Sequence, residues 1–364
     1  MKLKKYRVLG LMTGTSIDGI DVALIETDGL GYVKPLAFMP NPYDFEFRKK
    51  LRRYLGNPRG REDLDVCAFE HELTELHAEI VSRFRQKYPD LCEKIDLVGF
   101  HGQTIWHNPK QRRTIQLGDG ALLARMINIP VINDFRAADI LAGGQGAPLV
   151  PLYHRALSLD LPKPLAIFNI GGVSNVTWVG GEHDDQILAF DVGPGNALID
   201  DWVLRHTGEP YDEYGLLAAG GHIDVELVET AMANKFFKKR PPKSLDRDEF
   251  KHLVPEDISV ADGAATLTKI TCCGIVESLK FMPQLPQQIY VAGGGRLNTT
   301  MMRWIAELSN IPANPVDILG WSGDGLEAEA FAYLAVRSRL GLALSVPGTT
   351  GVPEPLTGGA YHTP

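Results

Sequence analysis

Residues 11–21 combine the residue types that can hold a phosphate group. The segment reads Leu-Met-Thr-Gly-Thr-Ser-Ile-Asp-Gly-Ile-Asp and lies between two apolar runs, so we expect it to form the turn of a β-hairpin. Gly14 and Gly19 allow a ligand to approach the backbone closely. Asp18 and Asp21 add carboxylates that could orient a hydrated cation. This turn is therefore suited to binding phosphates together with Mg²⁺.

A second segment, about half a chain further on, repeats this pattern. The apolar run 166–170 leads into Gly171-Gly172-Val173-Ser174-Asn175, and a second apolar run follows at 176–179. Two similar hairpins in one chain indicate two related lobes that bind the phosphates of a nucleotide.

Asp191 is the candidate catalytic base. It follows the predicted strand 187–190 and precedes Gly193-Pro194-Gly195-Asn196, which leads into a predicted helix at 197–205. A carboxylate at a strand end, beside glycines and a helix N-terminus, could accept a proton from a hydroxyl group or water. The alternative is an aspartate that only caps the helix.

Three further features have two interpretations each. The glycines at 293–295 fit a nucleotide site, but a plain packing turn has the same sequence. His101 and His107 lack a third ligand at metal-binding spacing, which favours hydrogen-bonding or structural roles. Arg136 could bind an anion, or it could pair with a neighbouring aspartate. Neither a P-loop nor a Gly-x-Ser-x-Gly nucleophile motif occurs.

The elements that must position these residues follow an alternating pattern of strands and helices, which predicts an α/β protein. The segment 235–250 is expected to be a surface excursion, 142–148 a hinge or a loop, and the tail from 347 an extended segment. Beyond the hairpins, the predicted strands are 95–100, 114–117, 131–133, 187–190 and 288–292, and the predicted helices are 61–87, 121–127, 197–205, 261–280, 299–308 and 326–340.

Length and composition set the remaining limits. A chain of 364 residues favours two domains. The net charge, 37 minus 45 or −8, argues against a broad nucleic-acid-binding or anionic-membrane surface, and the short basic clusters at 2–5 and 237–243 are expected to be solvated. Four cysteines without a Cys-x-x-Cys pair, and no run long enough to span a membrane, predict a cytoplasmic protein with reduced thiols.

These segments, in this order, resemble the anhydro-N-acetylmuramic acid kinase family of the sugar kinase, Hsp70 and actin superfamily. The resemblance covers nearly the whole chain and includes several long, nearly uninterrupted strings. It rests on residues 10–21, 99–104, 116–118, 134–136 with Asp139, 143–151, 169–175, 191–196, 292–295 with Asn298, and 327–328 with 330–332.

The resemblance implies a two-lobed, actin-like (ribonuclease H-like) α/β fold of duplicated domains with a nucleotide cleft between them. The first lobe would comprise 1–142 plus a tail at about 343–364, and the second would comprise 143–342. The implied activity is ATP-dependent opening of the 1,6-anhydro bridge of 1,6-anhydro-N-acetylmuramic acid with phosphorylation of O6, which gives N-acetylmuramic acid 6-phosphate and ADP in bacterial peptidoglycan recycling. A homodimer is a family-level expectation.

The resemblance also gives roles to individual residues. Asp191 would be the base that activates water, and Asp18 would orient Mg²⁺ through water. The positions expected to bind ATP and its phosphates are Gly14, Thr15, Ser16, Ile17, Asp18, Gly19, Ile20, Asp21, Gly171, Gly172, Gly293, Gly294 and Gly295. Those expected to bind the sugar are His101, Arg136, Asn196 and Glu327.

Two other functions share parts of this pattern. A levoglucosan-type kinase would open the same bridge in a sugar without lactyl and N-acetyl groups, and it would use the same catalytic residues. Arg136 is the candidate that could separate the two by binding the lactyl carboxylate. An ATP-gated chaperone or sensor would need a peptide-binding or DNA-binding segment, and the sequence shows no such segment.

Overall fold

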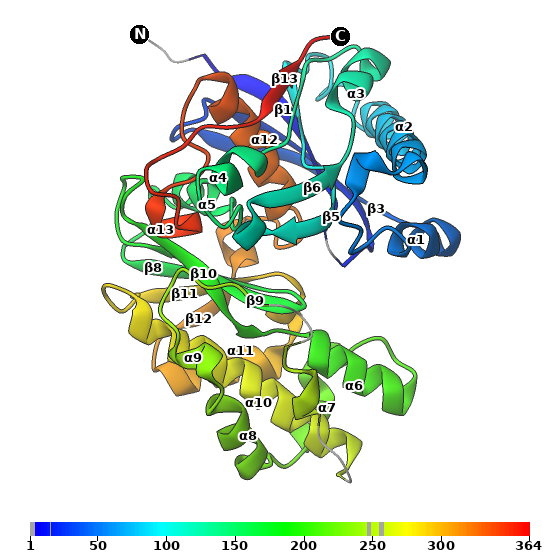
Figure 1. Cartoon of the computed structure of the whole chain (residues 1–364). Coiled ribbons are helices and arrows are strands. Elements are labelled where there is room, and N and C mark those ends of the chain that lie inside the picture. The colour runs from blue at the N-terminus through cyan, green and yellow to red at the C-terminus, as the bar shows by residue number, and fades with distance from the viewer. Residues whose placement is uncertain (1–3, 15, 246–248, 255–257) are drawn as a thin grey trace. The chain divides into compact units, whose positions relative to one another are not determined.

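The chain folds into two compact units (Figure 1). The computed structural model describes residues 4–14, 16–245, 249–254 and 258–364. The first unit comprises Met1–Asp160 and Gly325–Pro364, and the second comprises Leu161–Asp324. These boundaries differ from those expected, since residues 143–160 and 325–342 belong to the first unit.

The sheet of the first unit has the strand order β13-β7-β4-β1-β2-β3. Strands β1, β2 and β3 form an antiparallel meander, and β4 and β7 continue the sheet parallel to β1. A separate antiparallel pair is formed by β5 and β6. The bounds are β1 Tyr6–Met12, β2 Gly19–Thr27, β3 Val33–Pro42, β4 Leu97–Phe100, β5 Gln103–Asn108, β6 Arg113–Leu117, β7 Val131–Asn133 and β13 Ala360–His362.

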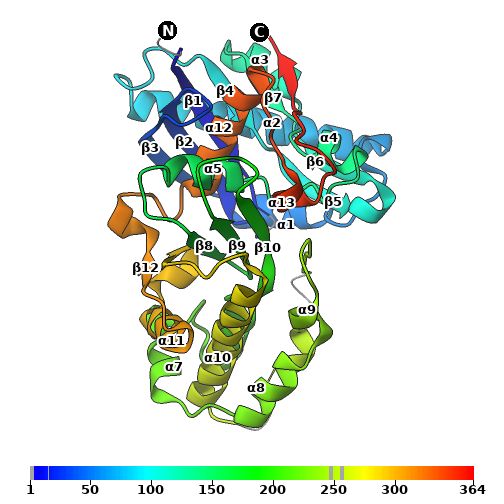
Figure 2. The ribbon, with the colours of Figure 1, turned by 90° about the vertical axis from the view of Figure 1, so that its left-hand side faces the viewer.

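The helices of the first unit include α12, which packs directly on the sheet (Figure 2). A Cβ atom on Gly10 of β1 would fall on the carbonyl oxygen of Ala328, and one on Gly99 of β4 would fall on that of Phe331. Only glycine allows this approach. Helix α5 is linked to α12, and so to the first unit, by a hydrogen bond of 2.6 Å from the Tyr153 hydroxyl to Glu329. The bounds are α1 Phe45–Arg52, α2 Leu64–Lys87, α3 Gly120–Ile127, α4 Ala137–Leu141, α5 Pro151–Leu157, α12 Leu326–Arg339 and α13 Pro347–Thr350.

The sheet of the second unit repeats the topology of the first. Its order is β10-β9-β8-β11-β12, with an antiparallel meander from β8 to β10 and with β11 and β12 parallel to β8. This matches β3-β2-β1-β4-β7 strand for strand, so the predicted duplicated, ribonuclease H-like α/β fold is confirmed. The bounds are β8 Leu165–Ile170, β9 Val173–Val179, β10 Ile187–Pro194, β11 Gln288–Ala292 and β12 Ala313–Pro315.

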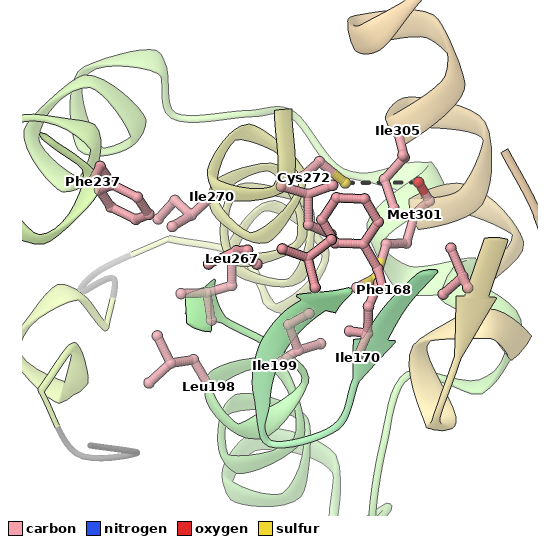
Figure 3. Close-up of a cluster of buried hydrophobic side chains, with 14 of the residues drawn as sticks. Phe168, Ile170, Leu198, Ile199, Phe237, Leu267, Ile270, Cys272, Met301 and Ile305 are labelled. Carbon is pink, nitrogen blue, oxygen red and sulfur yellow. Dashed lines mark hydrogen bonds between the residues drawn. The ribbon is translucent and has the colours of Figure 1, made fainter. Parts of the chain in front are cut away.

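The core of the second unit lies between this sheet and its helices (Figure 3). Phe168 and Ile170 of β8 meet Leu267 and Ile270 of α10 in one buried cluster. None of the helices among the described residues is long and apolar enough to cross a membrane. The bounds are α6 Ala197–Thr207, α7 Leu216–Gly220, α8 Val225–Met232, α9 Lys235–Lys238, α10 Val260–Ser278 and α11 Thr299–Ser309.

Two segments differ from the sequence-based expectation. In the described part of 235–250 the expected surface excursion is only partly correct, because Lys238, Lys239 and Arg240 are exposed whereas Phe236, Phe237 and Phe250 are buried in the core of the second unit. The tail is not merely extended, since it forms α13 and then β13, which pairs antiparallel with β7. Apolar side chains and free backbone groups at a sheet edge therefore draw both segments into packed structure.

Substitution of Gly10 by alanine tests the contact between α12 and β1. The added methyl group cannot fit, so we expect a loss of about 2–4 kcal/mol in the free energy of unfolding, measured by urea denaturation. Gly220→Ala is the control, because a Cβ at Gly220 meets no atom within 4 Å. Equal stability of the two variants would contradict the close packing.

Candidate active site

The loop between β1 and β2 is held in place by neighbouring polar groups. Thr13 Oγ1 donates to the carbonyl of Gly102 over 2.7 Å, and Gln103 Nε2 donates to the carbonyl of Gly14 over 3.2 Å. At the exposed tip of the loop, Ser16 Oγ donates to Asp18 Oδ1 over 2.9 Å. Exposed hydroxyl and carboxylate groups therefore sit on an anchored backbone. Thr15, a predicted phosphate ligand, lies outside the described residues.

The residues of this loop divide into structural and ligand-accessible groups. The side chains of Ile17 and Ile20 are buried in the core, which leaves only their backbone for binding. Gly19 is required by packing, because a Cβ there would overlap the carbonyl of Asn41. A Cβ on Gly14 would meet only Ser16, its Oγ at 3.3 Å and its backbone nitrogen at 3.9 Å. The space beside Gly14 is therefore open to a ligand.

Three predicted sugar-binding residues of the first unit interact with one another. Arg136 donates from Nε to Nε2 of His101 over 3.0 Å, and from Nη1 to the carbonyl of Gly146 over 2.6 Å. Burial lowers the pKa of Arg136 to about 10, while Glu327 and Asp139 act against this shift. Burial also lowers the pKa of His101 well below its usual range, and the charge of Arg136 adds to the effect.

Glu327, on the first turn of α12, completes this group. Burial raises the pKa of its carboxyl, Arg136 opposes that shift, and Asp18 adds to it. The electrostatic coupling links the sugar-binding candidates to the loop between β1 and β2. A cation, a neutral imidazole and a carboxyl group together can recognise a ligand that carries both hydroxyl and anionic groups.

The glycine-rich stretch 142–148 is tied into the first unit. Buried Asp139 accepts hydrogen bonds of 2.6 Å from the Gly146 N–H and from Thr350 Oγ1. The N–H of Gln145 also donates to the carbonyl of Thr350 over 2.8 Å. Asp139 therefore organises this loop, which in turn holds Arg136 through the Gly146 carbonyl.

In the second unit, the turn between β8 and β9 lies against the start of α6. The N–H groups of Gly195 and Asn196 donate to the carbonyls of Gly172 and Gly171, over 3.0 and 2.7 Å. These N–H groups at the start of α6 are therefore already used. A Cβ on Gly171 or Gly172 would meet only one atom each, at 3.8 or 3.6 Å, so the fold does not require glycine there. The bare turn is suited to close approach by a ligand.

Asn196 lies with the nucleotide candidates of the second unit. Its Nδ2 donates to the carbonyl of Ile170 over 3.1 Å, and a Cβ on Gly294 would lie 3.4 Å from the same nitrogen. The side chain therefore connects the turn after β8 with the glycines after β11.

The glycine run after β11 has both structural and open positions. A Cβ on Gly293 or Gly295 would collide with the end of β8, whereas Gly294 faces open space apart from Asn196. Arg296 holds the run by donating to the Gly293 carbonyl over 3.0 Å, and it pairs with Asp324 through two hydrogen bonds of 2.8 and 2.9 Å. The sequence analysis did not identify Arg296, although its position directly after three glycines could have indicated that it holds their backbone.

Asp191 lies within β10, which continues to Pro194, and not at a strand end. The pairing with β9 shifts by one residue between Asp191 and Gly193, which forms a bulge. Its Oδ2 accepts a hydrogen bond of 2.8 Å from the Leu245 N–H. Burial raises the pKa of Asp191 to about 6, against the opposing effects of that N–H and of Lys243. A carboxyl group with this pKa is suited to act as a base near neutral pH.

The residues beside the loop between β1 and β2 fit a hydrated Mg²⁺ ion bound mainly by phosphates. Among the described residues, no group of three His, Cys, Asp or Glu side chains could enclose a metal. Asp18 offers one exposed carboxylate at the loop tip, and Asp21 lies nearby on β2. Both carboxylates act on the partly buried Tyr43, whose hydroxyl pKa is raised mainly by burial. Mg²⁺ commonly binds one or two carboxylates together with substrate phosphates.

Two ribonuclease H-like units, each with an open glycine turn after its first strand, define a protein of the actin-like ATPase and sugar kinase class. A sequence model described as "Anhydro-N-acetylmuramic acid kinase" matches residues 6–364. The chain is 48% identical to the enzyme of that name from Rhizorhabdus wittichii, over 100% of both chains. It is 49% identical to that of Paramagnetospirillum magneticum, over 98% of this chain and 99% of the relative. The chain belongs to the anhydro-N-acetylmuramic acid kinase family, and the predicted kinase is confirmed.

The raised pKa of Asp191 predicts how the free energy of unfolding depends on pH. The pKa is raised from 3.8 to about 6, so the folded state binds the proton more tightly than the unfolded chain, and ionisation destabilises the fold as the pH rises through this range. Asparagine cannot ionise. Asp191→Asn should therefore be more stable than wild type by about 2–3 kcal/mol at pH 8, and most of this gain should vanish near pH 4. Urea denaturation at both pH values measures it, and a gain independent of pH would contradict the assignment.

Proposed function

We propose that the protein uses ATP and water to open the 1,6-anhydro bridge of 1,6-anhydro-N-acetylmuramic acid and to phosphorylate O6. The products are N-acetylmuramic acid 6-phosphate and ADP, and the step belongs to bacterial peptidoglycan recycling in the cytoplasm. The observation that carries the proposal is the Asp191 carboxylate, which is held by the Leu245 N–H and has a pKa of about 6. Family membership supports the choice of sugar.

Asp191 acts as the base in ring opening. Its carboxylate accepts a proton from water while the water oxygen forms a bond to the anomeric carbon. The bond between that carbon and O6 breaks, and its electron pair goes to O6. As in inverting glycosidases, water enters on the face opposite the departing oxygen. Because Oδ2 is held by the Leu245 N–H, Oδ1 is the oxygen left for the proton.

O6 then takes the γ-phosphoryl group of ATP. The new O6–phosphorus bond forms as the bond to the bridging β-phosphate oxygen breaks, and ADP leaves. The phosphoryl group replaces the acid that a glycosidase would need for its leaving group. Backbone N–H groups in 14–21 and at 171–172 position the phosphates, and residues 293–295 lie beside the adenosine. Asp18 would orient a bound Mg²⁺ through water, and the ion would neutralise charge on the phosphates.

Arg136, His101 and Glu327 bind the sugar. The coupling of Arg136 to Glu327 and to the imidazole of His101 supports a site for hydroxyl groups and for the lactyl carboxylate. We assign Asn196 to nucleotide binding and not to sugar binding, because its amide is bound to the Ile170 carbonyl beside Gly294.

The decisive experiment is incubation of the protein with Mg-ATP and 1,6-anhydro-N-acetylmuramic acid in ¹⁸O-water, followed by mass spectrometry of the sugar. We expect one ¹⁸O at the anomeric oxygen and one new phosphate in the same product. Asp191→Asn should lower the rate of both changes together, by about 10²–10⁴-fold. Phosphorylation without ¹⁸O would refute coupled hydrolysis. Turnover of levoglucosan without turnover of 1,6-anhydro-N-acetylmuramic acid would mean that levoglucosan is the substrate.

Gly172→Ala tests the role of the turn in the second unit. The fold tolerates a Cβ there, so the thermal midpoint should be unchanged. The methyl group should obstruct a phosphate and raise the KM for ATP about tenfold, with little change in the KM for the sugar. Gly220→Ala is the matched control, with a free Cβ position away from the turn. A normal KM for ATP in Gly172→Ala would remove this turn from the phosphate site.

A further inference from the structure

Lys243 is a buried lysine beside the candidate base. It is only 5% exposed, although it lies in a basic cluster that was expected to be solvated. Its Nζ lies 4.5, 4.7 and 5.6 Å from the ring centroids of Phe236, Phe281 and Phe190. Nζ also donates to the carbonyl of Phe236 over 3.3 Å. Three aromatic rings and one carbonyl therefore surround a charged group that would otherwise be costly to bury.

The backbone around Lys243 lies along the free edge of β10. The N–H of Asp191 donates to the Lys243 carbonyl over 3.1 Å, and the N–H of Leu245 donates to Asp191 Oδ2 over 2.8 Å. Residues 243–245 therefore form two hydrogen bonds with Asp191, one to the backbone of Asp191 and one to its side chain. These contacts lie next to the bulge in β10, where the regular pairing with β9 is interrupted.

We propose that Lys243 is a positioning residue for Asp191: its ammonium group, held among the three rings, anchors residues 243–245 against β10 and favours the ionised form of the Asp191 carboxylate. The proposal rests on the assignment of Asp191 as the base. Lys243 touches no reacting atom in this scheme. It acts by holding the Leu245 N–H in place and by supplying positive charge.

The charged groups around Lys243 support this role. Burial lowers the pKa of Lys243 to about 8, Asp191 of β10 and Glu277 of α10 act to raise it, and Lys239 of the same segment acts to lower it. Lys243 is therefore charged at neutral pH. Its positive charge opposes the effect of burial on the pKa of Asp191. Without Lys243, Asp191 would hold its proton to a higher pH and would be a base in a smaller fraction of molecules.

The test compares the pH dependence of kcat/KM for sugar phosphorylation in three full-length variants. Lys243→Met keeps an unbranched apolar stem among the rings and removes the charge. The acid limb of its kcat/KM–pH profile reports the ionisation of the base in the free enzyme. This limb should move up by about one pH unit relative to wild type. Lys243→Arg keeps the charge and should restore the wild-type position. Lys238→Met removes an exposed charge from the same segment and should leave the limb unchanged.

Leu245→Pro provides a second, independent test. Proline lacks the N–H that binds Asp191 Oδ2, while Lys243 is retained, so the acid limb should again move up. This variant keeps the proposal testable if Lys243→Met does not fold, which the thermal midpoint will reveal. An unshifted acid limb in a folded Lys243→Met or Leu245→Pro would overturn the proposal and leave Lys243 as a loop anchor only.

Failure of this inference can be told apart from failure of the proposed function. If Asp191→Asn remains fully active, Asp191 is not the base and both conclusions fail. If Asp191→Asn is inactive and Lys243→Met keeps the wild-type pH profile, only the role of Lys243 fails.

Discussion

The close approach of α12 to the first sheet is the constraint on which the chemistry of that unit depends. Bare backbone at Gly10 and Gly99 lets the helix lie directly on β1 and β4. Strand β1 leads into the predicted phosphate loop, β4 leads to His101, and the first turn of α12 carries Glu327. One backbone contact therefore sets the separations among all three groups. A side chain at either glycine would displace them together.

The two units use one topology for different chemistry. In the first unit, the turn after the first strand carries exposed side chains, whereas the equivalent turn in the second unit offers only glycine backbone. The third strand of each meander is a sheet edge. Strand β3 protects its edge with prolines, but β10 carries Asp191 and is covered by residues 243–245. The second unit thus covers its exposed edge with a segment that also contacts the candidate base.

Sequence patterns predicted the fold class and most of the regular elements, because apolar periodicity and glycine turns are local signals. The prolines of β3 concealed an edge strand, and β13 forms only by pairing with the distant β7. For the candidate site, the sequence indicated Asp191 but not its partners, since Lys243 and Leu245 lie more than fifty positions away and carry no motif. The sequence predicts that the basic cluster at 237–243 is solvated, and only the structure shows that three aromatic rings enclose Lys243.

The division of the first unit into two stretches of chain has a consequence for synthesis on the ribosome. Its sheet core needs α12 and β13, which lie after the whole of the second unit in the sequence. Residues 161–324 can therefore reach their native fold while the first unit still lacks its central helix and one edge strand. Until residues 325–364 emerge, the face of β1, β2 and β4 that α12 covers stays open, although α2 and α3 can already pack on the opposite face. This nascent state is the one most exposed to aggregation and to chaperones.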